Sequence, residues 1–163
     1  WQRGHQEYDS RFMSYNLESG EFEVLLDNKF VSHFCWLSGR ELLVYAADKS
    51  GRKCYHNLNM DTNETTPYLA DRLTVDGHPS LDRKGARLVT DSYPDLARIQ
   101  HLLIVRRESG DVSCIGRFYA PTKFVGAVRC DLHPRWDRQG NRICVDTTYT
   151  GRRSLCLIDV DSL

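Results

Sequence analysis

Three histidines, His33, His78 and His133, occupy the same place in three related segments of the chain. They are 45 and 55 residues apart, and each is followed three positions later by a tryptophan or a leucine. Imidazole nitrogens are common ligands of divalent metals. If the fold brings these side chains together, they could begin a metal site. They could equally recognise a polar ligand without a metal, or hold the backbone of a neighbouring segment.

Charged residues recur in the same register. Asp91 and Asp146 lie thirteen positions after their histidines, where each could orient an imidazole by accepting a hydrogen bond from its ring N–H. A basic residue stands twenty positions after each histidine, as Lys53, Arg98 or Arg153. Guanidinium groups pair with carboxylates in a two-pronged geometry, so the arginines could bind an acidic sugar chain. The alternative is an ion pair between each arginine and the aspartate of its own segment.

Two tyrosines lie in connections just after these aspartates. Tyr93 belongs to the sequence DSYPD and Tyr149 to DTTYT. At the rim of a sheet, such aromatic side chains could stack on sugar rings. We therefore count Tyr93 and Tyr149 with Arg98, Arg153, Asp91 and Asp146 as candidate ligand-binding residues.

The repeated segments share a pattern of β-strands. A short strand is expected at each histidine, followed by a turn containing glycine and by a second strand, ELLVYAA, ARLVTDS or NRICVDT. A third strand follows, and GDVSCIGRFYA supplies a fourth in the middle segment. No stretch shows a convincing helical period. The chain is therefore predicted to be all-β.

Four antiparallel strands in each unit of about 40–50 residues are typical of a β-propeller blade. We expect residues 1–163 to form a single partial propeller domain. Residues 10–30 would be the second half of a blade, 31–76 and 77–128 complete blades, and 129–163 an incomplete one. About three and a half blades of a ring of six to eight would be present, so we expect the chain to be a fragment without its N-terminal blades.

Composition limits the partners of the protein. The 163 residues carry 22 basic and 22 acidic side chains, so no net charge would attract nucleic acid. No apolar run approaches the roughly 18 residues needed to span a bilayer. The spacing of the six cysteines is unlike that of a zinc finger, and four of the six lie in strand-like runs. This favours reduced, buried thiols and a cytoplasmic location, with a periplasmic location as the alternative.

The segments DLHPRWDRQGNRICVDTTYTGRRSLCLIDV and GHPSLDRKGARLVTDSYPD resemble blades of TolB-type propellers. The histidine at the start of each unit also resembles the oligogalacturonate lyases, and the uncharacterised propellers of bacterial polysaccharide-synthesis loci. The resemblance to the lyases implies that His33, His78 and His133 hold a divalent metal, manganese, beside a uronic acid. That family also uses a glutamine, but Gln100 is expected in a connection and Gln139 in a turn.

Three functions follow from these observations. The first is a carbohydrate-associated binding or scaffolding propeller, with an acidic oligosaccharide bound at the mouth of the central channel. The second is a metal-dependent oligogalacturonate lyase that acts by β-elimination. The third is a platform that binds a protein partner through its blade faces. Whether the protein is an enzyme is left open by the sequence.

Overall fold

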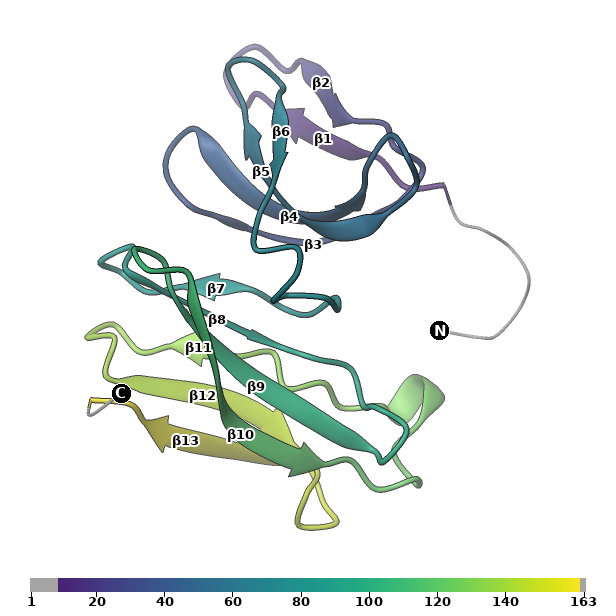
Figure 1. Ribbon diagram of the computed structural model, residues 1–163. Helices are drawn as coiled ribbons and strands as arrows, with labels where there is room; N and C mark the ends of the chain where they lie inside the picture. The colour runs from purple at the N-terminus through teal and green to yellow at the C-terminus, as the bar shows by residue number, and fades with distance from the viewer. Residues whose placement is uncertain (1–8, 162–163) are drawn as a thin grey trace. The chain divides into compact units, whose positions relative to one another are not determined.

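The computed structural model describes residues 9–161, which fall into two compact units, 9–74 and 75–161. Both units consist of antiparallel β-strands joined by turns (Figure 1), and η1 (Gly126–Val128) is a single turn of 3-10 helix. The prediction of an all-β chain is therefore confirmed. Among the described residues, no helix has the length and apolar character needed to cross a membrane.

Residues 9–74 form two sheets. A hairpin pairs β1 (Phe12–Tyr15) with β2 (Phe22–Leu26), and the turn between them contains Gly20 at a positive φ of 74°. The second sheet is a meander in the order β3-β4-β5-β6. Its strands are β3 (Val31–Trp36), β4 (Glu41–Ala47), β5 (Lys53–Asn59) and β6 (Thr65–Pro67).

Apolar side chains from both sheets form the core of this unit. The hairpin contributes Leu25 and Leu26, while β4 and β5 contribute Leu42, Val44 and Leu58. Strand β4 is buried from Leu42 to Ala47, as expected for an apolar strand covered on both faces. Burial of these side chains stabilises the fold by about 1.5–3 kcal/mol each relative to exposure.

Residues 75–161 also form two sheets, a meander in the order β7-β8-β9-β10 and a three-stranded sheet in the order β11-β12-β13. The first sheet comprises β7 (Ser80–Leu81), β8 (Arg87–Asp91), β9 (Ile99–Arg106) and β10 (Asp111–Tyr119). The second comprises β11 (Arg135–Trp136), β12 (Arg142–Thr147) and β13 (Ser154–Asp159).

These two sheets share a hydrophobic core. Val89 and Leu102 on one side meet Leu132, Ile143 and Val145 on the other, and all five are buried.

Polar bonds also join the two sheets at several points. The Trp136 indole donates to the carbonyl of Ser80 at 3.0 Å. The guanidinium of Arg87 lies 4.8 Å from the Trp136 ring and donates to the carbonyl of Gly140. Hydrogen bonds to main-chain groups depend on direction, so they fix how the sheets are aligned as well as how closely they pack.

The second and third strands of each repeat lie close to their predicted positions, but the innermost strands differ. Strands β7 and β11 begin two residues after His78 and His133, because Pro79 and Pro134 have no N–H to donate to a neighbouring strand. His33 lies within β3, as predicted.

The expected position of Gln100 was wrong. This residue lies in β9 and its side chain is fully buried, with Nε2 donating to the carbonyl of Cys130 at 3.1 Å. Gln139 does lie in a turn.

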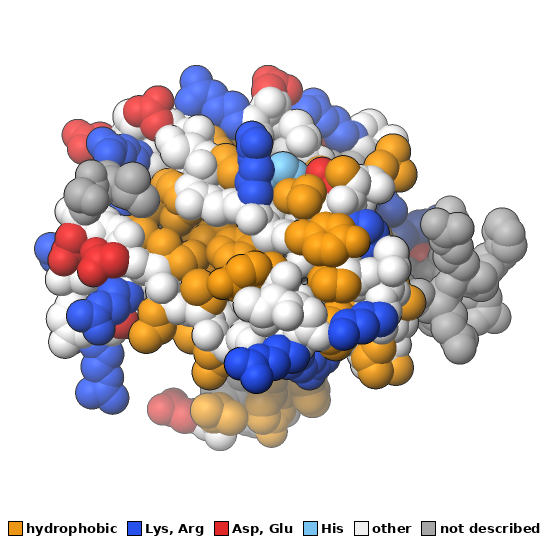
Figure 2. Space-filling view, turned by 90° about the horizontal axis from the view of Figure 1, so that it is seen from below, with side chains coloured by type: hydrophobic (Ala, Val, Ile, Leu, Met, Phe, Trp, Pro, Cys, Tyr) orange, Lys and Arg blue, Asp and Glu red, His pale blue; other side chains and the backbone are white. Residues whose placement is uncertain are grey.

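Two leucines are exposed on the outer face of the three-stranded sheet, beside the charged side chains of Asp146 and Arg142. Leu155 and Leu157 on β13 are 68% and 66% exposed, whereas Ile143 and Val145 on β12 point into the core. Figure 2 shows hydrophobic side chains gathered over the face that this sheet presents. One side of the sheet therefore forms a core, and the other meets solvent.

Candidate functional site

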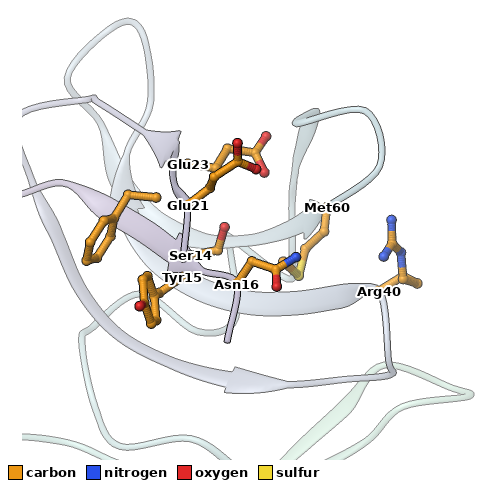
Figure 3. A pocket seen from close by; sticks show the side chains of 8 residues that line it. Ser14, Tyr15, Asn16, Glu21, Glu23, Arg40 and Met60 are labelled. Carbon is orange, nitrogen blue, oxygen red and sulfur yellow. The ribbon is translucent and has the colours of Figure 1, made fainter. Parts of the chain in front are cut away.

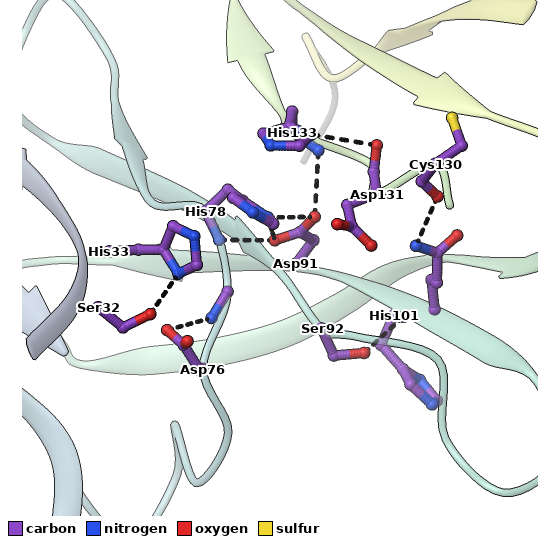
Figure 4. Close-up of polar contacts among 12 residues, drawn as sticks. Ser32, His33, Asp76, His78, Asp91, Ser92, His101, Cys130, Asp131 and His133 are labelled. Atoms are coloured by element: carbon purple, nitrogen blue, oxygen red, sulfur yellow. Dashed lines mark hydrogen bonds and ion pairs between the residues drawn. The ribbon is translucent and has the colours of Figure 1, made fainter. Parts of the chain in front are cut away.

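Asp91 organises a polar cluster in residues 75–161. It ends β8, and its side chain is completely buried. Oδ1 accepts the main-chain N–H of His78 at 2.7 Å, and Oδ2 accepts that of His133 at 3.1 Å (Figure 4). One carboxylate therefore binds the chain just before β7 and just before β11, the innermost strands of successive sheets.

The same carboxylate orients the His78 ring. Nδ1 of His78 lies 2.9 Å and 3.0 Å from the two oxygens of Asp91. Because an ionised carboxylate only accepts, this nitrogen carries the proton, and the lone pair of the neutral ring is on Nε2. Nδ1 of His133 lies 3.3 Å from the carbonyl of Asp131, which requires the same tautomer.

The two imidazoles lie side by side. Their centroids are 3.8 Å apart, with 38° between the ring planes. His78 is mostly buried, with 13% of its side chain exposed, whereas His133 is exposed. These two histidines, which occupy equivalent positions in successive repeats of the sequence, therefore have their rings in direct contact.

The local backbone makes this arrangement possible. A Cβ atom on Gly77 would lie 1.9 Å from the carbonyl oxygen of Asp91. Only glycine therefore allows the backbone to pass this close to β8. His133 adopts a positive φ of 42°, which is uncommon for a residue with a side chain. Such strain persists where surrounding contacts enforce it, as the hydrogen bond that the N–H of His133 donates to Asp91 does here.

Aromatic and charged groups adjoin the histidines. The centres of the Tyr93 and His78 rings are 5.7 Å apart with 71° between the ring planes, and the Arg129 guanidinium lies 4.7 Å from the centre of the Tyr93 ring. Arg129 also pairs with Asp131 at 2.8 Å, and Oδ1 of Asp131 is buried without a hydrogen-bond partner. We call His78, Asp91, Tyr93, Arg129, Asp131 and His133 the paired-histidine site.

The surroundings of Tyr93 are rich in carboxylates. The pKa of the Tyr93 hydroxyl is raised to about 12, mainly by burial and also by the charges of Asp76, Asp131 and Asp91, while Arg129 lowers it. Three negative carboxylates and one positive guanidinium therefore surround the Tyr93 hydroxyl, so the local charge is negative. Such a balance favours cations and hydroxyl groups over bare anions.

The side chains of the site could supply some, but not all, of the ligands that a metal ion needs. Two imidazoles with Nδ1 held by oxygen acceptors are typical metal ligands, and a buried carboxylate behind one of them is a typical supporting group. Across residues 9–161, however, no group of three or more His, Cys, Asp or Glu side chains is arranged to hold an ion. His78 and His133 would therefore need additional donors.

The remaining candidates make other contacts. His33 belongs to residues 9–74, where its Nδ1 lies 2.9 Å from the hydroxyl of Ser32. Arg98 donates to the carbonyl of Ala120 at 3.0 Å, and Arg153 donates to that of Arg129 at 2.8 Å. The ion pairs considered for these two arginines are therefore replaced by bonds to main-chain carbonyls.

Asp146 and Tyr149 also lie outside the paired-histidine site. Asp146 pairs with Arg135 at 3.0 Å. The Tyr149 ring contacts that of Phe118 at 6.1 Å, and the side chain is about half exposed. Their predicted ligand roles, like those of Arg98 and Arg153, stay predictions.

Sequence reasoning missed three contributors to the cluster. Asp76 and Asp131 both lie two positions before a repeated histidine, so the register used for Asp91 could have identified them. Arg129 has no basic counterpart before His78 and carries no such signal.

An open hollow of about 650 Å³ lies beside β1 and β2 in the other unit (Figure 3). Its wall includes Tyr15 and Phe22, whose rings are 4.6 Å apart, and the acidic residues Glu21 and Glu23. None of the residues predicted from the sequence lines it.

Comparison with known proteins identifies the fold. No family model and no curated protein matches the sequence. Among solved structures, an oligogalacturonate lyase in complex with manganese superposes with a TM-score of 0.76 and 15% identity, over 98% of this chain and 43% of that one. The oligogalacturonate lyase from Vibrio parahaemolyticus gives 0.72 and 13%, over 98% and 44%. TolB from Acinetobacter baumannii gives 0.65 and 13%, over 93% and 38%.

The chain spans less than half of each of these proteins. At such low identity, the likeness concerns the fold and not the activity. The successive antiparallel sheets and these similarities together show that the chain is part of a β-propeller of the kind found in oligogalacturonate lyase and TolB.

Proposed function

We propose that the chain is part of a carbohydrate-binding propeller whose ligand site is the paired-histidine site. The observation that carries the proposal is the buried Asp91 carboxylate, which holds His78 and His133 with their rings in contact. In propellers the innermost strand of each blade borders the central channel. Residues at the start of β7 and β11 would then lie at the mouth of that channel.

The side chains of the site suit a sugar ligand. Tyr93 offers an aromatic ring and a hydroxyl that burial keeps protonated, and Arg129 offers hydrogen-bond donors. A few convergent polar groups beside an apolar surface are typical of small-molecule sites. Because the nearby carboxylates repel a bare uronate, an acidic oligosaccharide would bind together with a divalent cation.

Calorimetric titration of the chain with trigalacturonate tests the proposal. We expect binding in the presence of Mn²⁺ that weakens when a chelator is added. Asp91→Asn should weaken trigalacturonate binding about tenfold or more. The NH₂ group of asparagine would face one of the N–H donors that the carboxylate now accepts, and that donor would lose its hydrogen bond. His133→Asn should also weaken binding while tolerating the positive φ, because asparagine adopts that conformation readily.

Asp159→Asn, at an exposed position of β13, is the matched control and should bind like the unmodified chain. Absence of binding to trigalacturonate with and without Mn²⁺, or equal binding by the Asp91→Asn and Asp159→Asn variants, would refute the proposal.

A second candidate is a metal-dependent lyase acting on uronate chains. It is favoured by the two lyases among the similar structures and by the negative surroundings of the imidazoles. His78 and His133 would supply two ligands, and a cation bound beside the uronate carboxylate would acidify the proton on the adjacent carbon. Ultraviolet absorbance of an unsaturated product, formed from trigalacturonate only with Mn²⁺, would establish this activity, and binding without product would exclude it for this chain.

A further inference from the structure

A thiol, an imidazole and a carboxylate lie in line on the four-stranded sheet of residues 75–161, away from the paired-histidine site. Sγ of Cys114 on β10 is 3.9 Å from Nδ1 of His101 on β9. Nε2 of the same imidazole is 3.2 Å from Oδ2 of Asp95, in the turn that leads into β9. A nucleophile, a base and a group that orients the base are the parts of an activated cysteine.

The order of these atoms fixes the direction of proton transfer. Asp95 is held ionised, because the main-chain N–H of Ile99 and the His101 ring both lower the pKa of its carboxyl. A carboxylate only accepts, so Nε2 of His101 carries the ring proton. Nδ1 then presents its lone pair toward Sγ of Cys114, 3.9 Å away. The thiol donates to the carbonyl oxygen of Gly116 at 3.4 Å and can turn from that oxygen to His101, which would take its proton.

The backbone holds the imidazole in this position. The N–H of His101 donates to the Ser92 hydroxyl, and the N–H of Ser92 donates to the His101 carbonyl, both at 3.0 Å. Asp95 is tied to the start of β9 as well, because its Oδ1 accepts the N–H of Ile99 at 2.9 Å. The base and its orienting group therefore share one rigid strand end.

A β-bulge positions the thiol. The pairing of β10 with β9 shifts between Cys114, opposite Leu103, and Gly116, opposite Leu102. The extra residue, Ile115, packs against the core while Cys114 remains exposed. Bulges commonly redirect a side chain in this way.

The site is open to small reactants in solution. Cys114 is exposed, and the His101 side chain is 32% exposed. Cys54 and Cys130 are buried, and burial raises the pKa of both thiols. Cys144 lies 3.8 Å from Arg135, but a guanidinium already carries its proton and cannot act as a base.

We propose that Cys114, His101 and Asp95 form a reactive cysteine site that is modified by low-molecular-weight disulfides. His101 takes the proton from the thiol, and the thiolate attacks one sulfur of the disulfide. A bond forms between Sγ of Cys114 and that sulfur, while the original S–S bond breaks. The departing thiolate takes the proton from His101, so one disulfide and one thiol are consumed and one of each is formed.

Reaction of the reduced chain with glutathione disulfide at neutral pH tests this inference. The modified fraction of each cysteine is followed over time by mass spectrometry of its peptide. Cys156, a partly exposed cysteine of the same unit, is the internal reference. We expect Cys114 to react about tenfold faster than Cys156, because His101 lies within reach to take the thiol proton as the sulfur attacks.

Two variants separate the role of His101 from simple exposure. His101→Gln should lower the rate at Cys114 about tenfold and leave Cys156 unchanged. Asp95→Asn should lower it less, because the imidazole remains while the group that orients it is weakened. Equal rates at Cys114 and Cys156 in the unmodified chain, which need no variant, would overturn the proposal. An unchanged Cys114 rate in a folded His101→Gln protein would also overturn it.

Discussion

At the scale of single residues, Asp91 has the largest influence on the candidate ligand site. Its buried carboxylate receives two main-chain N–H groups and one imidazole N–H. Each of these bonds involves an ionised acceptor, the class of hydrogen bond that contributes most in proteins. The positions of His78 and His133 therefore depend more on this side chain than on each other.

Tyr93 gives a prediction about pH. Burial raises its pKa to about 12, above the value of about 10 expected in the unfolded chain. The folded state thus prefers the neutral hydroxyl, and the stability that this provides is complete below about pH 10 and is lost as the pH rises toward 12. Ultraviolet titration should show a component of the tyrosine absorbance that ionises near pH 12, and this component should be missing from Tyr93→Phe.

The Tyr93→Phe protein should also lose less stability than the unmodified chain between these pH values in denaturant titrations. A Tyr93→Phe titration identical to that of the unmodified chain would show that the hydroxyl ionises normally and would contradict the prediction.

At the scale of strands and turns, close approach of the backbone limits substitution. Gly77 passes so near to β8 that an added Cβ would overlap the carbonyl of Asp91. Gly39, in the connection between β3 and β4, has open space around it and no positive φ. The two glycines therefore provide a matched pair.

Gly77→Ala should lower the free energy of unfolding by about 1–3 kcal/mol, because the chain must move away from β8. Gly39→Ala should leave it within about 0.5 kcal/mol of the original value. Chemical denaturation monitored by circular dichroism measures both. An equally small effect of the two substitutions would mean that the segment before β7 adjusts freely.

The sequence predicted the strands well where their side chains alternate or form apolar runs. ELLVYAA corresponds to β4, and GDVSCIGRFYA contains β10. It failed where a tertiary bond decided the outcome. Gln100 is polar and was expected in a connection, but its bond to the carbonyl of Cys130 compensates for complete burial in β9.

The candidate site was predictable to a similar degree. The repeat identified His78, Asp91 and His133 and suggested that an aspartate could orient an imidazole. It could not show that Asp91 also binds the next sheet, nor that Asp146 would pair with Arg135 instead. Contacts between segments depend on how the sheets twist and pack, which a shared register does not specify.

At the scale of the whole molecule, the exposed outer face of the three-stranded sheet should govern solubility. Leu155 and Leu157 lie together on β13 and point away from the core. Apolar side chains grouped on one face promote association between molecules.

Replacing both Leu155 and Leu157 with glutamate should raise the solubility of the chain and leave its melting temperature nearly unchanged, since no core contact is lost. Leu96→Glu, at an isolated and fully exposed position, should change neither property. Static light scattering over a range of concentrations and thermal unfolding measure the two effects. A marked fall in melting temperature for the double variant would show that these leucines support the sheet from outside the core.

The double attachment of Asp91 has a consequence for protein engineering. Any replacement at this position alters the presentation of the imidazoles and the joint between two successive sheets together, so changed affinity and changed rigidity would be difficult to separate. Attempts to redirect ligand preference should therefore leave position 91 intact and vary Tyr93, whose ring lies against that of His78.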